Sequence, residues 1–66
     1  MNVWLNGEAA ETRGARTIAD LADRYGLHPN GILIEHNGIA LHKREWTERE
    51  LAEADRVEVI RVVAGG

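Results

Sequence analysis

Only one long segment of the chain repeats its apolar residues at helical spacing, and this limits the fold to a single main helix. The apolar residues that share one face of this helix are Ile18, Leu21, Ala22 and Tyr25. Thr17 can cap the unpaired N–H groups at its start, and Asp20 brings a negative charge to its positive first turn. Gly26 supplies the left-handed residue that commonly ends a helix. Such a helix needs a sheet on which to bury its apolar face.

The residues before this helix predict a β-hairpin. In the opening run, Val3 and Leu5 fall on one face of a strand and Trp4 on the other. The Asn-Gly pair at 6–7 is the strongest short signal for a hairpin turn. A short returning strand is expected at about 9–12, where an Arg-Gly pair ends it.

Three further strands are predicted after the helix, at 32–35, about 40–42 and 56–63. An Asn-Gly turn joins the first two of them, and in the last one Val57 and Val59 alternate with Glu58, Ile60 and Val62. The charged, irregular segment between the last two strands predicts a loop with a short helical turn. Its large apolar residues, Trp46 and Leu51, are expected to close the lower part of the core.

The order of these elements predicts an α+β fold of the β-grasp type. A hairpin, a helix that crosses one sheet face, two strands and a last strand inserted beside the first give a mixed sheet of about five strands on one main helix. We expect residues 1–63 to form this domain. Residues 64–66 are expected to be a flexible tail that ends in two glycines, which have no Cβ and adopt almost any backbone conformation.

The composition narrows the classes of function. A chain of 66 residues buries only about 60% of its unfolded surface, so a deep, enclosed active site is not expected. It has no Cys, and its net charge of −3 argues against binding nucleic acid and favours a basic partner surface. The first residues contain neither a charged leader nor a membrane-spanning apolar run, so a soluble, cytoplasmic protein is expected.

The side chains predict neither a catalytic site nor a metal site. His28, His36 and His42 are eight and six residues apart, and no carboxylate stands among them at a recognisable ligand spacing. The sequence has no signature of a Ser-His-Asp catalytic triad. Its glycine pairs lie in turns or at the end of the chain, so they do not predict a phosphate-binding loop.

The ending Ala64-Gly65-Gly66 is the strongest candidate for a functional group. Many domains end in small residues without any role, and a Gly-Gly end alone is a weak motif. Its position directly after the last strand of a predicted β-grasp domain favours the hypothesis that this ending has a function. The reactive group would then be a main-chain carboxylate on a narrow arm.

Several stretches resemble the ThiS family of sulfur carriers, within the wider family of ubiquitin-like carriers. The resemblance covers essentially the whole chain, and the matching stretches are "VWLNGE", "TIADLADRYG", "IEHNGIALHKREW" and "DRVEVIRVVAGG". Two positions depart from the family's usual residues: Lys43 replaces an Arg three residues before the Trp, and His36 replaces a Val.

The resemblance implies a carrier acted on by enzymes rather than an enzyme. A ThiF-like enzyme would use Mg-ATP to adenylate the carboxylate of Gly66, with Ala64 and Gly65 recognised beside it. Sulfur from a persulfide-bearing protein would replace AMP, and a ThiG-like thiazole synthase would take it from the resulting thiocarboxylate. No cofactor would stay bound to the carrier. A carrier for another product, such as molybdopterin, cysteine or a specialised metabolite, and a non-carrier ubiquitin-like binding module are the alternatives.

Strand alternation also predicts a docking face. If the inward residues of the strands cover the helix, four large apolar residues lie on the uncovered face of the sheet: Trp4, Leu33, Ile60 and Val62. They would form one apolar patch beside the tail. In the alternative, Trp4 folds over a sheet edge and the others are scattered surface residues. Arg61 either guides the tail toward an acidic groove or is simply solvated.

Overall fold

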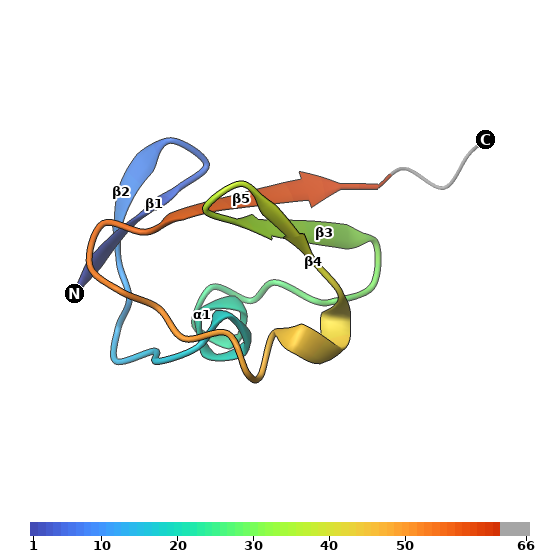
Figure 1. Cartoon of the computed structure of the whole chain (residues 1–66), viewed down its shortest axis with the longest axis horizontal. Helices are drawn as coiled ribbons and strands as arrows, with labels where there is room; N and C mark the ends of the chain where they lie inside the picture. The colour runs from blue at the N-terminus through green and yellow to red at the C-terminus, as the bar shows by residue number, and fades with distance from the viewer. Residues whose placement is uncertain (63–66) are drawn as a thin grey trace.

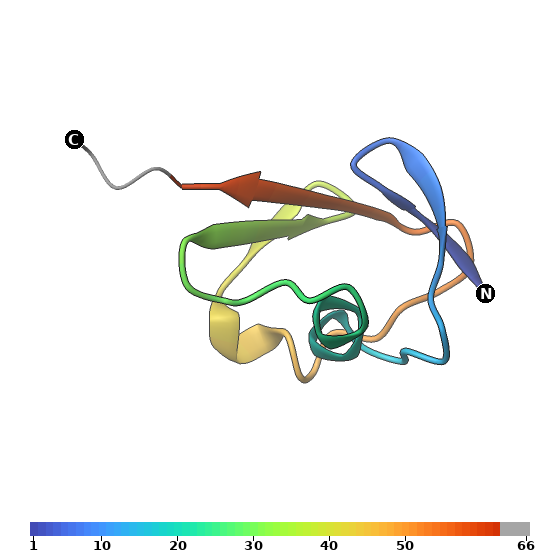
Figure 2. The same ribbon diagram turned by 180° about the vertical axis from the view of Figure 1, so that it is seen from behind.

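Five strands form one mixed sheet that lies over helix α1 in the computed structural model, which describes residues 1–62 (Figures 1 and 2). The strands are β1 (Asn2–Leu5), β2 (Glu8–Glu11), β3 (Ile32–His36), β4 (Ile39–Leu41) and β5 (Arg56–Arg61). The helices are α1 (Ile18–Arg24) and a single 3₁₀ turn, η1 (Lys43–Glu45). Helix α1 covers one face of the sheet, and both views leave the other face uncovered.

The strand order is β2-β1-β5-β3-β4. Strand β5 runs parallel to β1 and antiparallel to β3, so the last strand is inserted beside the first. The two hairpins, β1–β2 and β3–β4, flank it on either side. The α+β, β-grasp arrangement predicted from the sequence is confirmed.

The hairpin turns confirm the signals in the sequence. Asn6 and Asn37 have φ of 51°, and the following glycines, Gly7 and Gly38, have φ of 82° and 84°. Two consecutive positive φ values define the type I′ turn, whose twist matches that of the flanking strands. Both returning strands begin directly after these turns. The strands expected at 9–12 and 40–42 therefore lie one residue earlier than predicted.

Helix α1 begins after the predicted cap, Thr17, and Asp20 adds a second set of capping hydrogen bonds. The Oγ1 of Thr17 accepts a hydrogen bond from the backbone N–H of Asp20 at 3.1 Å. The Asp20 carboxylate in turn accepts from the backbone N–H of Arg16 at 3.1 Å and of Thr17 at 3.3 Å. This reciprocal capping box stabilises the helix start more than a favourable charge alone. The hydrogen bonds from Arg16 and Thr17 together outweigh the opposing effect of burial and lower the pKa of Asp20.

The core lies between α1 and the inner face of the sheet. The buried apolar residues are Val3, Ala15, Ile18, Leu21, Ala22, Ile32, Ile34, Leu41, Trp46 and Val57. Trp46 is 5% exposed and follows η1, so its predicted role in the lower core is confirmed, and Leu51 packs against the same cluster while partly buried. The indole Nε1 of Trp46 has no hydrogen-bond partner within residues 1–62. Neither described helix has the length and apolar character that crossing a membrane requires.

Candidate functional site

The proposed reactive residues follow β5 in the chain, separated from its end at Arg61 by two residues. Ala64, Gly65 and Gly66 lie outside the described residues, so their expected roles stay predictions. Just after β5, the Val62 backbone N–H donates a hydrogen bond to the Gly31 carbonyl at 2.8 Å. The side chains at this end of β5 are therefore the described residues nearest in the chain to the proposed reactive group.

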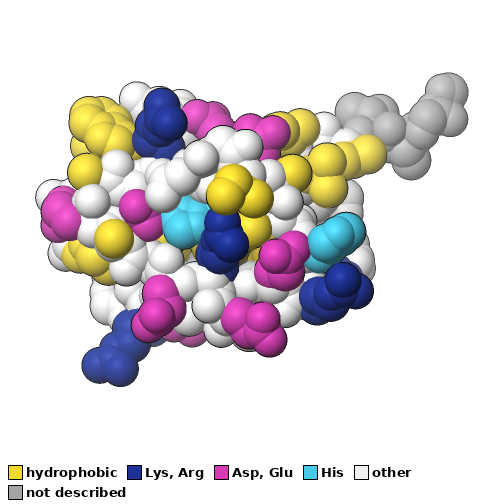
Figure 3. Space-filling view, viewed as in Figure 1, with side chains coloured by type: hydrophobic (Ala, Val, Ile, Leu, Met, Phe, Trp, Pro, Cys, Tyr) yellow, Lys and Arg dark blue, Asp and Glu magenta, His cyan; other side chains and the backbone are white. Residues whose placement is uncertain are grey.

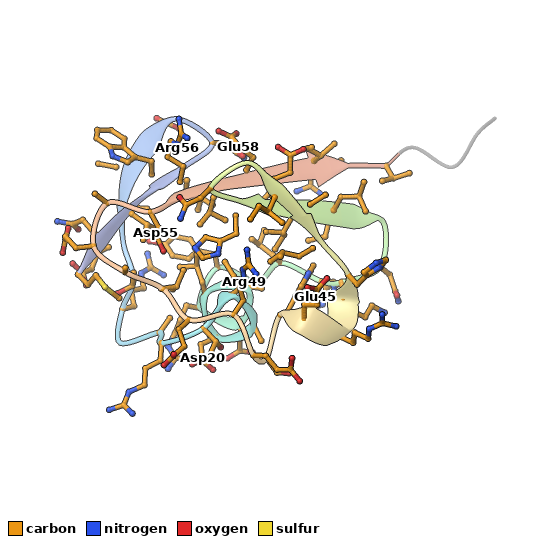
Figure 4. The ribbon with its side chains drawn as sticks, in the orientation of Figure 1. Asp20, Glu45, Arg49, Asp55, Arg56 and Glu58 are labelled. Carbon is orange, nitrogen blue, oxygen red and sulfur yellow. The ribbon has the colours of Figure 1, made fainter. Side chains whose placement is uncertain are left out.

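The side chains of β5 alternate between the core and the uncovered sheet face. Val57 is fully buried and Val59 is half-buried, whereas Arg56, Glu58 and Ile60 are exposed. Figure 4 shows Arg56 and Glu58 on the side of β5 that points away from α1. The four residues predicted for the docking face are all exposed: Trp4 by 46%, Leu33 by 50%, Ile60 by 42% and Val62 by 50%.

The strand register corrects the expectation that these four residues form one patch. Leu33 lies opposite Ile60, and Val62 follows on the same side of the chain. Trp4 instead lies opposite Arg56, four residues earlier on β5, or about 13 Å away along the strand. In Figure 3, two hydrophobic areas along the upper rim are separated by charged side chains. The outward face therefore has a tail-proximal patch, defined as Leu33, Ile60 and Val62, and Trp4 separately at its far end.

A partly buried polar cluster lies at the start of β5, at the opposite end of the strand from residues 64–66. His36 Nε2 lies 2.7 Å from Asp55 Oδ2, and the Arg49 guanidinium donates from Nε to His36 Nδ1 at 3.2 Å. Since Nδ1 accepts, the hydrogen of this imidazole is on Nε2 and is donated to Asp55. Figure 4 shows Arg49 and Asp55 beneath the sheet, on its α1 side. The contacts tie the loop before β5 to the end of β3.

The cluster was missed in the sequence because its members are far apart. His36 and Asp55 are separated by 19 positions, and no local spacing joins them. The structure gives His36 a structural partner, while His28 and His42 take no part in this cluster. Residues 1–62 contain no group of three or more potential ligands placed to hold a metal ion.

Asp55 is the centre of this cluster. Its carboxylate accepts hydrogen bonds from the Ala52 backbone N–H at 2.8 Å and from Asn37 Nδ2 at 3.1 Å, besides the contact with His36. Burial opposes its ionisation, but these hydrogen bonds, the one from His36 foremost, outweigh burial and lower the pKa of Asp55. Asp55 therefore holds the start of β5 in place as a carboxylate.

Acidification is expected to remove the stabilisation that Asp55 gives to the fold. Because its pKa is lower in the folded state, the stabilisation is complete above the unfolded pKa of about 3.9 and is lost as the pH falls through the folded pKa. Asp55→Asn should lower the free energy of unfolding by about 1–3 kcal/mol at pH 7. Thermal unfolding followed by circular dichroism should show this difference shrinking as the pH falls below the unfolded pKa.

Glu48→Gln is the control for this experiment, because Glu48 is exposed and accepts no side-chain hydrogen bond within the described residues. It should change the unfolding midpoint little at any pH. A difference between the parent and Asp55→Asn that does not shrink as acid is added would show that the Asp55 charge does not stabilise the fold.

Comparison with known proteins gives a consistent result. The ThiS family model matches residues 3–66. The chain is 33% identical over 64 residues to the sulfur carrier protein ThiS of Thermus thermophilus, covering 97% of this chain and 98% of that protein. It is 32% identical over 63 residues to the sulfur carrier protein ThiS of Bacillus subtilis, covering 94% and 96%. A crystal structure of the thiamine biosynthesis protein ThiS from Geobacter metallireducens has the same fold, with a TM-score of 0.84 and 23% identity over the whole of both chains.

Proposed function

The chain belongs to the ThiS family of sulfur carriers, and from this premise we propose that it carries sulfur as a thiocarboxylate on Gly66 for thiazole formation in thiamine synthesis. The observation that carries the proposal is the extent of the family match, which runs through the terminal Ala64-Gly65-Gly66. A sulfur carrier is a substrate of other proteins and not a catalyst. The proposed setting is the cytoplasm.

The proposed chemistry follows from the low reactivity of a carboxylate. A carboxylate is a poor electrophile, so a ThiF-like enzyme would join the Gly66 carboxylate oxygen to the α-phosphorus of Mg-ATP and release pyrophosphate. A persulfide sulfur would then attack the acyl carbon, and AMP would leave. A thiol would cleave the resulting acyl disulfide, which yields a thiocarboxylate on Gly66 and a disulfide. A ThiG-like synthase would then take the sulfur.

Sulfur loading tests this proposal directly. The protein is incubated with Mg-ATP, a ThiF-like adenylating enzyme and a persulfide donor, and its intact mass is measured. The expected result is a gain of about 16 Da, because one oxygen is replaced by sulfur. No gain with an adenylating enzyme that loads another ThiS protein would overturn the proposal. Transfer of the sulfur to a ThiG-like synthase would separate the thiamine pathway from another sulfur pathway.

We also propose that the tail-proximal patch is a docking site for these partners. Three exposed apolar side chains gather beside the last described residues of the chain, and contiguous exposed apolar surface commonly marks an interaction site. A partner that takes up the tail would have to approach this end of β5. The patch would therefore be covered in the complex and exposed in the free carrier.

Ile60→Glu is expected to weaken binding to the adenylating enzyme about 10- to 100-fold, the effect of removing a central apolar contact. Its unfolding midpoint should change little, because Ile60 is 42% exposed. Isothermal titration calorimetry measures the affinity. Ile39→Glu is a matched control: Ile39 is 53% exposed but lies on edge strand β4 opposite His36, which faces the core. Equal losses of affinity in both variants would remove the argument for a patch at β5.

A further inference from the structure

The outward face of the sheet carries two carboxylates directly opposite each other. Glu35 of β3 and Glu58 of β5 are partners in the antiparallel register. Both strands are interior to the sheet, so neither side chain can turn away over a sheet edge. Side chains in this relation have Cβ atoms about 4.5–5.5 Å apart, and like charges so placed destabilise a sheet.

The described residues do not neutralise this pair. None of the ion pairs found within residues 1–62 includes Glu35 or Glu58, and neither carboxylate accepts a hydrogen bond there. Arg56 lies two positions before Glu58 on the same face and forms no ion pair with it within that part of the chain (Figure 4). The repulsion is therefore retained on a surface where neutral residues would be more stable. Departures of this kind from local stability are concentrated at functional sites.

The surroundings of the pair determine what would neutralise it. Glu58 lies two residues from Ile60 on β5, or about 6–7 Å, and Glu35 lies two residues from Leu33 on β3. The pair thus borders the tail-proximal patch on the side away from the tail. A surface that covered the patch with apolar side chains would bring its next residues over the two carboxylates.

We infer that the Glu35–Glu58 pair receives a basic side chain of the protein partner that docks on this face, with arginine as the best fit. This inference rests on the proposed docking role of the tail-proximal patch. A guanidinium presents several N–H donors in one plane and can hydrogen-bond both carboxylates, which a compact ammonium group does less well. The partner surface is accordingly one with an arginine beside apolar side chains. The net charge of −3 agrees with a basic partner.

A contact between a partner arginine and the two carboxylates would both favour association and select partners by charge. Before binding, the pair repels; after binding, one cation neutralises both charges, so association gains from relief of the repulsion as well as from the new contact. Interfacial charges of this kind increase the association rate and reject surfaces of the wrong charge. A neutral or acidic surface with the same apolar shape would leave two carboxylates unpaired and would be discriminated against.

Charge-neutralised variants test the inference, with a ThiF-like adenylating enzyme as the probe. Glu35→Gln and Glu58→Gln should each weaken binding about tenfold, and the loss should shrink as salt is raised from 50 to 500 mM, roughly the range over which surface charges become screened. Glu48→Gln, which removes an exposed carboxylate elsewhere, should leave the affinity unchanged. Wild-type affinity in both variants, or a loss that does not depend on salt, would overturn the inference.

A second measurement needs no partner. In the free protein, each of the two Gln variants should raise the unfolding midpoint, and the gain in the double variant should be less than the sum, because either substitution alone removes the repulsion. Lower midpoints would show that the pair stabilises the fold and would also overturn the inference. Sulfur loading of the wild-type protein is measured in parallel. If loading fails, the proposed function is wrong; if loading occurs but the variants bind normally, only the partner chemistry is wrong.

Discussion

Removal of Gly66 is expected to abolish sulfur loading completely and to leave the unfolding midpoint of the domain unchanged. The proposed reaction occurs on the main-chain carboxylate of this residue, and shortening the chain withdraws that carboxylate by one residue from the site of adenylation. The buried residues that the structure describes all lie between Val3 and Val57, so the deletion removes none of these side chains. Intact-mass spectrometry after incubation with Mg-ATP, the adenylating enzyme and a persulfide donor measures loading.

Gly66→Ala is the matched control for this deletion. It keeps a carboxylate at the same position and adds one methyl group, so loading should be slower but should still occur. The difference between the two variants separates the need for the carboxylate from the need for a narrow chain. Normal loading of the shortened chain would show that sulfur is attached elsewhere. A large fall in its unfolding midpoint would instead assign Gly66 a structural role.

The elements that the sequence predicts well are those with local causes. The start of α1 depends on Thr17 and residues within one helical turn of it, and the two Asn-Gly turns set their hairpins through their own backbone conformations. The inward positions of Val57 and Val59 follow from strand alternation alone. These features were predicted because each is determined by a few consecutive residues. The one-residue shifts of β2 and β4 arose because the turn, not the apolar pattern, sets where pairing begins.

The features that the sequence does not predict depend on pairing between distant segments. Alternation assigns Trp4 and Ile60 to the same face, but only the parallel register of β1 with β5 shows that they lie far apart along it. The same holds for Glu35 and Glu58, which the antiparallel register places opposite each other. The assignment of Gly66 as the reactive residue is based on a sequence motif and a family resemblance. The separation of Trp4 from the tail-proximal patch, by contrast, is known only from the structure.

The same substitution at the two tryptophans of the chain should have a large effect on stability at Trp46 and a small one at Trp4. Trp46→Ala removes a large side chain that is 95% buried and should lower the free energy of unfolding by about 3–5 kcal/mol. The total stability of a 66-residue domain is about 3–10 kcal/mol at typical values per residue, so much of the variant should be unfolded at 37 °C. Trp46→Phe should cost much less, because Nε1 has no hydrogen bond to lose within the described residues and most of the volume is kept.

Trp4→Ala is the matched control, since Trp4 is 46% exposed and its loss should change the free energy of unfolding by less than about 1 kcal/mol. Urea titrations followed by circular dichroism compare the variants. Equal destabilisation by the two alanine substitutions would contradict the assignment of Trp46 to the core. Sulfur loading adds a second distinction: Trp46→Ala should lose loading only in proportion to its unfolded fraction, and lowering the temperature should restore it. A loading defect in folded Trp4→Ala would instead place a partner contact at the far end of the outward face, about 13 Å along β5 from the tail-proximal patch.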